Sequence, residues 1–176
     1  CIKNTKNISF RISSLYPDIV DEYFCEVIKN KRVRPHFHMS IQSGSEKILK
    51  AMCRPYSPCD MEKACAMLRN AKKDAFLACD IITGFPGETD EDFEATLELC
   101  KKCDFSWVHV FPFSARPKTA AMNMKNQVLS GKSTKRAAIL SAWASENKKK
   151  YIESCSGKVF DAILENVKKN VFYTAE

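Results

Sequence analysis

The chain has 176 residues, of which 45% are hydrophobic and 28% charged, enough to bury one core and too apolar for a disordered tail. Nine irregularly spaced cysteines and no cationic, apolar leader argue against a secreted disulfide scaffold and favour a reducing cytoplasm, and the longest apolar run is too short to span a membrane. The net charge is +7, but residues 1–115 hold 16 basic and 16 acidic residues, so the excess lies after residue 115.

Four apolar segments with a period of two residues predict β-strands. They lie at Ile8–Ile12, Phe37–Ile41, Leu77–Ile82 and Trp107–Phe111. Segments with helical periodicity separate them. Alternation of strands and helices at this spacing predicts an α/β fold with a parallel sheet and right-handed crossovers.

The starts of the predicted helices carry capping signals. Asp18 can cap a first helix, whose apolar stripe runs over Ile19–Ile28. Ser57, followed by a proline and then Asp60, is typical of a capping box for the second. The third opens with Thr89 and three acidic residues, which suit the positive end of a helix.

Polar residues alternate with the apolar ones along the predicted strands, so one face of the sheet is polar. Its members are Ser9, Arg11, Ser13, His36, His38, Ser40, Gln42 and Asp80. A closed eight-stranded barrel fills its centre with branched apolar side chains, so a polar centre predicts an incomplete barrel whose lumen receives a ligand. The alternative is that these groups satisfy one another or bind water.

Glycines and prolines cluster after the strands, where ligand-binding loops of parallel sheets occur. Gln42-Ser43-Gly44-Ser45 can hold a ribose or a phosphate, or can simply begin a helix over residues 46–52. In the run from Asp80 to Glu88, Gly84 and Gly87 let the backbone approach a ligand or form a tight turn. This run is not a phosphate loop, because it lacks the GK[ST] ending.

Two pairs of side chains have metal-ligating chemistry, but neither predicts a metal site. His36 and His38 share one strand face, and Cys100 and Cys103 form a CxxC pair. No second CxxC accompanies that pair, so we interpret the cysteines as core or incidental residues.

After Pro117 the pattern becomes polar and basic, with 12 basic against 5 acidic residues over positions 116–176. A helix is predicted around Lys135–Ser154, followed by a strand-like piece over Lys158–Asn166. The basic excess favours a phosphate-rich partner, or else is a solvated lysine-rich face. We predict three regions: the sheet over residues 1–130, a basic linker helix over 131–155, and the start of a further domain over 156–176.

Four motifs, in this order and spacing, resemble the radical S-adenosylmethionine (SAM) methylthiotransferases. They are Arg11-Ile-Ser-Ser, Pro35-His-Phe-His-Met-Ser-Ile-Gln-Ser-Gly-Ser45, the run from Asp80 to Thr89, and His109-Val-Phe-Pro-Phe-Ser114. The resemblance extends over residues 8–128. PHFHMSIQSGS and HVFPFS…AAMNMKNQV are most similar to the branch that methylthiolates threonylcarbamoyladenosine beside the tRNA anticodon, and less similar to the isopentenyladenosine and ribosomal-protein branches.

This resemblance implies half of an open, partial TIM-like radical SAM barrel, followed by a helix and the truncated start of a TRAM β-barrel. It implies that a [4Fe–4S] cluster cleaves SAM to a radical, which activates C2 of the tRNA adenosine for methylthiolation, and that a second cluster serves sulfur insertion. No CxxxCxxC motif occurs in the sequence, which begins at Cys1. We therefore expect a carboxyl-terminal fragment without a cluster and without activity.

The resemblance also assigns candidate site residues. Those expected to bind the cosubstrate are Arg11, Ser13, His38, Gln42, Ser43, Ser45, Asp80, Gly84, Glu88, Val110 and Phe111. The basic excess after residue 115, rather than the resemblance, predicts the residues that bind RNA, namely Lys148, Lys149, Lys150 and Lys158. Lys118 departs from the family, which usually has glycine there.

Two alternative functions remain open. One is another radical SAM enzyme, or a lyase on a similar barrel. The other is a non-catalytic RNA-binding module, which predicts affinity for RNA without affinity for nucleoside ligands. The sequence names no sulfur donor.

Overall fold

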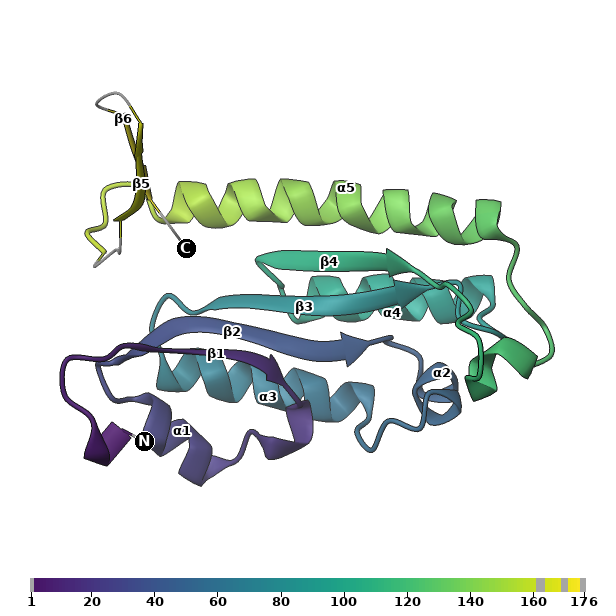
Figure 1. The fold of residues 1–176 in the computed structure, drawn as a ribbon, viewed down its shortest axis with the longest axis horizontal. Helices are drawn as coiled ribbons and strands as arrows, with labels where there is room; N and C mark the ends of the chain where they lie inside the picture. The colour runs from purple at the N-terminus through teal and green to yellow at the C-terminus, as the bar shows by residue number, and fades with distance from the viewer. Residues whose placement is uncertain (1, 161–163, 169–170, 175–176) are drawn as a thin grey trace.

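Four parallel strands form the centre of the fold in this computed structural model, which describes residues 2–160, 164–168 and 171–174. The strands are hydrogen-bonded in sequence order: β1 (Phe10–Leu15), β2 (Val33–Gln42), β3 (Phe76–Thr83) and β4 (Trp107–Pro112). All neighbouring pairs are parallel, and Figure 1 shows their arrowheads pointing to the same end. The predicted parallel β/α sheet is confirmed, with β1 shifted toward the carboxyl terminus and β2 longer than predicted.

Helices connect these strands, and a further helix follows the last strand of the sheet. They are α1 (Glu22–Ile28), α2 (Glu46–Ala51), α3 (Pro58–Ala71), α4 (Asp90–Lys102) and α5 (Ser130–Ser154). Short 3₁₀ turns occur at Ile2–Asn4, Pro17–Ile19 and Ala120–Asn123. In Figure 1, α3 and α4 lie behind the sheet and α5 runs along β4.

Two of the predicted helix starts are confirmed. Ser57 and Asp60 form a complete capping box, in which each side chain bonds the other residue's backbone N–H. Thr89 and Asp92 form a second box at the start of α4. Each box satisfies two backbone donors that the first turn of a helix leaves unpaired.

The predicted start of the first helix is wrong by three residues. Asp18 lies inside a 3₁₀ turn, and Asp21 caps α1 instead, because its Oδ1 accepts a hydrogen bond from the Phe24 N–H at 2.6 Å. The predicted apolar stripe also fails in part, since Tyr23 is 79% exposed whereas Ile28 is fully buried. A seven-residue helix turns only a narrow face to the core.

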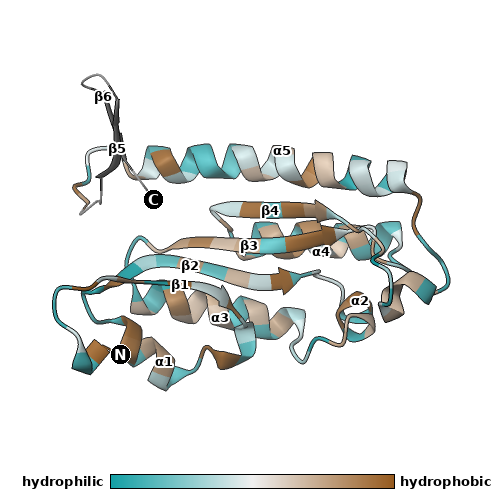
Figure 2. Cartoon of the chain, viewed as in Figure 1, coloured by the Kyte–Doolittle hydropathy of each residue, from teal (hydrophilic) through white to brown (hydrophobic). Residues whose placement is uncertain are grey.

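The core lies between the sheet and its covering helices. Alternate residues of the two central strands are fully buried there: Phe37, Met39, Ile41, Leu77, Cys79 and Ile81. Figure 2 shows hydrophilic bands within β2 and β3 between hydrophobic ones. The period-two pattern therefore sorts these strands correctly, and their polar residues lie on the face opposite the core.

The predicted basic helix is present but begins five residues earlier, at Ser130. It packs on β4 through Leu140 and Ala144, which are fully buried. Beyond it, β5 (Leu164–Lys168) and β6 (Val171–Thr174) pair with each other as an antiparallel hairpin. Part of the predicted strand-like piece, residues 161–163, lies outside the described residues, and the three-region division stays a prediction.

The turn at Lys118 adopts the conformation that glycine favours. The φ angle of Lys118 is +66°, and Pro117 precedes it, which is the pattern of a type II turn. The Thr119 N–H and hydroxyl both donate to the Arg116 carbonyl, at 3.3 and 2.7 Å. The departure from the family residue thus leaves the turn in place. Every helix among the described residues is too short or too polar to span a lipid bilayer.

Candidate functional site

The face of the sheet opposite the core carries a set of paired polar side chains. His38 Nε2 lies 2.8 Å from an Asp80 carboxylate oxygen, and Arg11 Nη2 lies 3.1 Å from His36 Nε2. His38 and Asp80 retain about a fifth and a quarter of their side-chain exposure. The sequence predicted that these four residues face the same way. The structure brings them together on one face, where they pair with one another.

Register shifts interrupt the pairing of β1 with β2 and of β2 with β3. They occur between Phe10 and Ile12 and between Ile12 and Leu15 in β1, and between Ser40 and Gln42 in β2. The φ angles of Ser14 and Gln42 are +56° and +72°. Bulges and strained backbone of this kind recur beside functional sites. Strict alternation did not predict these register shifts, so the orientation of Gln42, which is nearly buried, was not accessible from the sequence.

Ser43 and Ser45 hold the end of β2 against α4. The Ser43 hydroxyl accepts the Ser45 N–H at 3.1 Å and lies 3.3 Å from the Thr96 hydroxyl, which also accepts the Gly44 N–H. Ser45 caps α2 and donates to Asp92 at 2.7 Å. The interpretation of Gln42-Ser43-Gly44-Ser45 as a helix start is therefore confirmed. A ribose contact by Ser43 and Ser45 stays a prediction.

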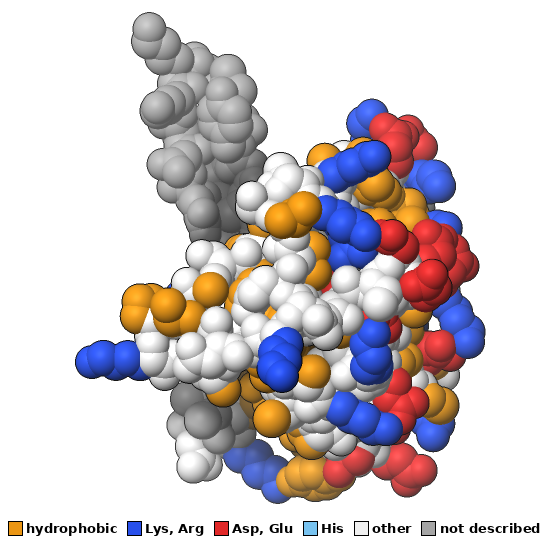
Figure 3. Space-filling model, turned by 90° about the vertical axis from the view of Figure 1, so that its right-hand side faces the viewer, with side chains coloured by type: hydrophobic (Ala, Val, Ile, Leu, Met, Phe, Trp, Pro, Cys, Tyr) orange, Lys and Arg blue, Asp and Glu red, His pale blue; other side chains and the backbone are white. Residues whose placement is uncertain are grey.

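Asp92 joins three segments at the carboxyl end of the sheet. Besides the Ser45 bond, it accepts the Thr89 N–H at 2.8 Å and pairs with Lys47. Burial by itself raises the pKa of Asp92, but the bonds from Lys47, Ser45 and Thr89 outweigh it and bring the pKa to about 2. Figure 3 looks onto this end of the molecule, where acidic and basic side chains intermingle.

We expect Asp92→Asn to lower the free energy of unfolding by about 1–2 kcal/mol at neutral pH. The folded pKa lies below the unfolded value, so the stabilisation by this carboxylate is complete above about pH 4 and disappears as the pH falls toward 2. Urea unfolding across this range should show the two proteins converging. Glu94→Gln, on the same helix, is the control, and an Asp92→Asn protein with an unchanged acid slope would contradict the assignment.

The Gly84–Glu88 turn is the docking point of α5. Thr83 and Ser133 exchange hydrogen bonds, from the Ser133 hydroxyl to the Thr83 carbonyl at 2.7 Å and from the Thr83 hydroxyl to the Ser133 carbonyl at 3.1 Å. The Glu88 carboxylate accepts from the Gly84 N–H at 2.7 Å and from Arg136 at 2.5 Å. Burial raises the pKa of Glu88, although Gly84 and Arg136 oppose that shift.

Sequence reasoning missed the partner of this turn. Arg136 is nearly as buried as Glu88, with side-chain exposures of 3% and 1%. The two residues are 48 positions apart in the sequence, so no local sequence pattern could have predicted that they pair. A cosubstrate role for Gly84 and Glu88 stays a prediction. Because α5 covers one side of this turn, a cosubstrate would have to contact the turn from another side.

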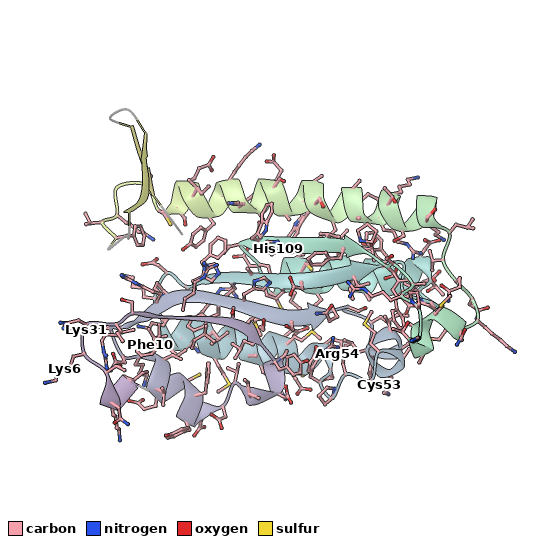
Figure 4. All side chains as sticks on the ribbon, in the orientation of Figure 1. Lys6, Phe10, Lys31, Cys53, Arg54 and His109 are labelled. Carbon is pink, nitrogen blue, oxygen red and sulfur yellow. The ribbon has the colours of Figure 1, made fainter. Side chains whose placement is uncertain are left out.

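The last strand presents aromatic side chains on the open face. Phe111 is half exposed, whereas Val110 packs against the core from the opposite face. Trp107 and His109 lie on the same face as Phe111 and were not among the predicted site residues. Figure 4 shows His109 on β4 below α5, while Arg54 and Cys53 lie near α2 at the other end of the sheet.

The predicted RNA-binding lysines are not equivalent. Lys148 Nζ lies 4.8 Å from the centre of the Trp107 ring, Lys149 pairs with Glu146 at 2.7 Å, and Lys158 pairs with Asp74 at 2.7 Å. Lys150 is exposed. Exposed ion pairs of this kind are weak, so these lysines can exchange their partners for phosphate.

The cysteines from Cys25 onward are free thiols. Cys65, Cys79, Cys100 and Cys103 belong to the core, and burial raises the pKa of the Cys79 thiol well above its usual value. Within the part of the chain that the structure describes, no three His, Cys, Asp or Glu side chains are placed to hold a metal ion. The described residues therefore do not fit an iron–sulfur cluster.

Surface hollows lie away from the polar face. One, of about 610 Å³, lies against α3 and α4 and includes Glu62 and Lys102. Another, of about 380 Å³, lies against the turn before α5 and includes Glu88 and Lys132. Of the predicted cosubstrate residues, these two hollows contain only Glu88.

Comparison with known proteins matches residues 1–100 to the model of the radical SAM superfamily. A threonylcarbamoyladenosine tRNA methylthiotransferase of Treponema pallidum is 44% identical over 93% of this chain and 34% of its own length. One of Thermotoga maritima is 42% identical over 88% of this chain and 36% of its own length. The chain thus spans about a third of the length of these curated relatives.

A solved structure with the same fold is coproporphyrinogen III oxidase (HemN) from Escherichia coli, described as a radical SAM enzyme. It matches 79% of this chain and 32% of its own chain, with a TM-score of 0.66 and 15% sequence identity. At that identity the match concerns the fold alone, and it agrees with a part of a radical SAM barrel.

Proposed function

The chain belongs to the radical SAM superfamily, and on that premise we propose that it is part of a cytoplasmic enzyme that methylthiolates C2 of threonylcarbamoyladenosine beside the anticodon of tRNA. The observation that carries this proposal is the 44% identity to the Treponema pallidum enzyme over 93% of the chain. The proposal also includes SAM as cosubstrate and two [4Fe–4S] clusters in the full-length protein.

The residues on the open face fit SAM in chemical type. Asp80 on this face offers an acceptor for ribose hydroxyls, and Arg11 offers a planar guanidinium suited to the methionine carboxylate. Gln42, which a register shift pairs with the core residue Ile81, offers a further acceptor at the end of β2. When bound, SAM supplies the radical that activates the adenine carbon. His38, hydrogen-bonded to Asp80 at 2.8 Å, holds that carboxylate in a fixed orientation. The cysteines of this sequence do not provide the CxxxCxxC ligands, so no step through a cluster is assigned to this chain.

The basic carboxyl-terminal part is proposed to bind the tRNA backbone. α5 carries six lysines and arginines against two glutamates, and Lys148, Lys149 and Lys150 lie consecutively near its end. Such contacts position RNA without reading its bases. Weak surface partners leave these cations available to phosphate at low salt.

We expect inactivation of the gene that encodes this chain to remove the 2-methylthio form of threonylcarbamoyladenosine from tRNA, with the unmodified nucleoside accumulating. Mass spectrometry of digested tRNA measures both. Asp80→Asn at the same locus should reproduce the loss, and exposed Glu94→Gln should not. Unchanged nucleosides in the inactivated strain would reject this function and favour the non-catalytic RNA-binding alternative.

A further inference from the structure

Three rings form a continuous ladder on the open face of the sheet. The His38 and His109 rings are stacked, with centres 5.0 Å apart and planes 14° from parallel. The Trp107 ring meets His109 edge-on at 5.9 Å. The ladder is near α5, because Lys148 lies over the Trp107 ring.

The strand register explains why these rings meet. Ala78 is paired with His38 on one side and with Trp107 on the other, and it is 1% exposed. A methyl side chain at the middle position leaves room for the rings to close over it. The ladder therefore depends on a small residue in β3 as well as on the aromatic residues themselves.

Fixed partners hold the two ends of the ladder, while its middle member is open. His38 is bonded to Asp80, and Trp107 has Lys148 over its ring. His109 is exposed, and it contacts the rings of His38 and Trp107. A flat, exposed ring with its orientation set by neighbours suits a planar ligand, because little ordering entropy is lost when the ligand binds.

We propose that His109, oriented by His38 and Trp107, is the platform on which the adenine base of the RNA substrate stacks. This inference rests on the proposed function and names the residues that hold the base. Unpaired RNA bases are recognised by stacking on aromatic and histidine rings, including rings on an open four-stranded sheet.

The surroundings of the ladder favour a base of RNA over the adenine of SAM. The ladder adjoins α5, whose charges sum to +4 from six basic and two acidic residues. Lys148, whose ammonium group lies over the Trp107 ring, therefore places positive charge beside the ladder, where the phosphates of a bound strand would run. Of the residues predicted to bind SAM, Gln42, Ser43, Ser45, Gly84 and Glu88 lie at or beyond the carboxyl ends of β2 and β3, whereas His38 belongs to the ladder.

The test compares two RNA hairpins that differ only in whether one loop position carries adenine or an abasic site. The unmodified chain is expected to prefer the adenine hairpin by about 5-fold to 150-fold, the range that stacking provides per base. His109→Ala should remove this preference without changing affinity for the abasic hairpin, and His109→Phe should restore it. In a Trp143→Phe background Trp107 is the only tryptophan, and its fluorescence should respond to the adenine hairpin alone.

Tyr23→Ala is the matched control, because Tyr23 is an exposed aromatic residue on α1. A His109→Ala protein that keeps its preference for adenine would overturn the inference, as would a loss of SAM affinity with RNA binding unchanged. Equal binding of both hairpins by the unmodified chain would also overturn it, while leaving the proposed function in place. Binding of neither hairpin would count against the proposed function as well.

Discussion

Replacing Arg136 with methionine is expected to lower the free energy of unfolding by about 3–5 kcal/mol, because it leaves the Glu88 carboxylate buried without its charged partner. The two side chains are 3% and 1% exposed, and their atoms lie 2.5 Å apart. Urea unfolding followed by circular dichroism measures the effect. Since Glu88 belongs to the turn after β3, the loss should also loosen the contact between that turn and α5.

Two further variants separate the buried pair from ordinary surface charge. Lys132→Met removes the exposed partner of Asp90 and should cost less than about 1 kcal/mol. The double variant Glu88→Leu with Arg136→Met should recover most of the stability, because no charge is then buried and the unpaired Arg136 Nε is removed too. A single Arg136→Met variant as stable as Lys132→Met would show that the ion pair does not anchor α5.

Gly84→Ala is expected to destabilise the protein by about 2–4 kcal/mol, because it combines backbone strain with steric overlap. The φ angle of Gly84 is +77°, and an added Cβ would overlap the Ser133 side chain. Thermal unfolding reports the change. Gly87→Ala is the matched control in the same turn, since its φ is +84° but no atom lies within 4 Å of its Cβ position.

Gly87→Ala should lower the free energy of unfolding by about 1–2 kcal/mol, because it introduces backbone strain without steric overlap. The difference between the two variants isolates the contact between the turn and α5. Equal losses would mean that Ser133 moves aside freely and that the close approach does not fix the helix. A larger loss at Gly87 would reject the docking role of Gly84.

These two expectations concern one arrangement, in which the helix with the basic residues is anchored on the turn proposed to line the cosubstrate site. Ser133 and Arg136 lie in the first two turns of α5, and Lys148–Lys150 lie near its end. A continuous helix of 25 residues thus links the turn to the proposed RNA contacts. Loss of the contact between α5 and the Gly84–Glu88 turn is therefore expected to affect both the proposed cosubstrate site and the proposed RNA contacts.

Much of the fold could be predicted from patterns within short stretches of the sequence. Period-two alternation predicted the four parallel strands, because each strand of a half-covered sheet buries every second side chain. Ser57 was recognised as a helix cap, because a capping box is complete within four residues, and the acidic residues after Thr89 marked the start of the next helix. Asp18 was a wrong cap since Asp21, equally suitable in type, lies three residues further along the same sequence.

Features that depend on neighbours in the chain could be predicted from the residues alone: strand periodicity, helix starts, the charge asymmetry, and the motifs of the radical SAM resemblance. Features that depend on residues far apart became visible only in the folded chain. The fold paired Glu88 with Arg136, closed the rings of His38 and His109 over Ala78, and redirected Gln42 by a register shift. Each of these requires the strand register and the docking of α5, which arise from packing of the whole core and leave no periodic trace in the sequence.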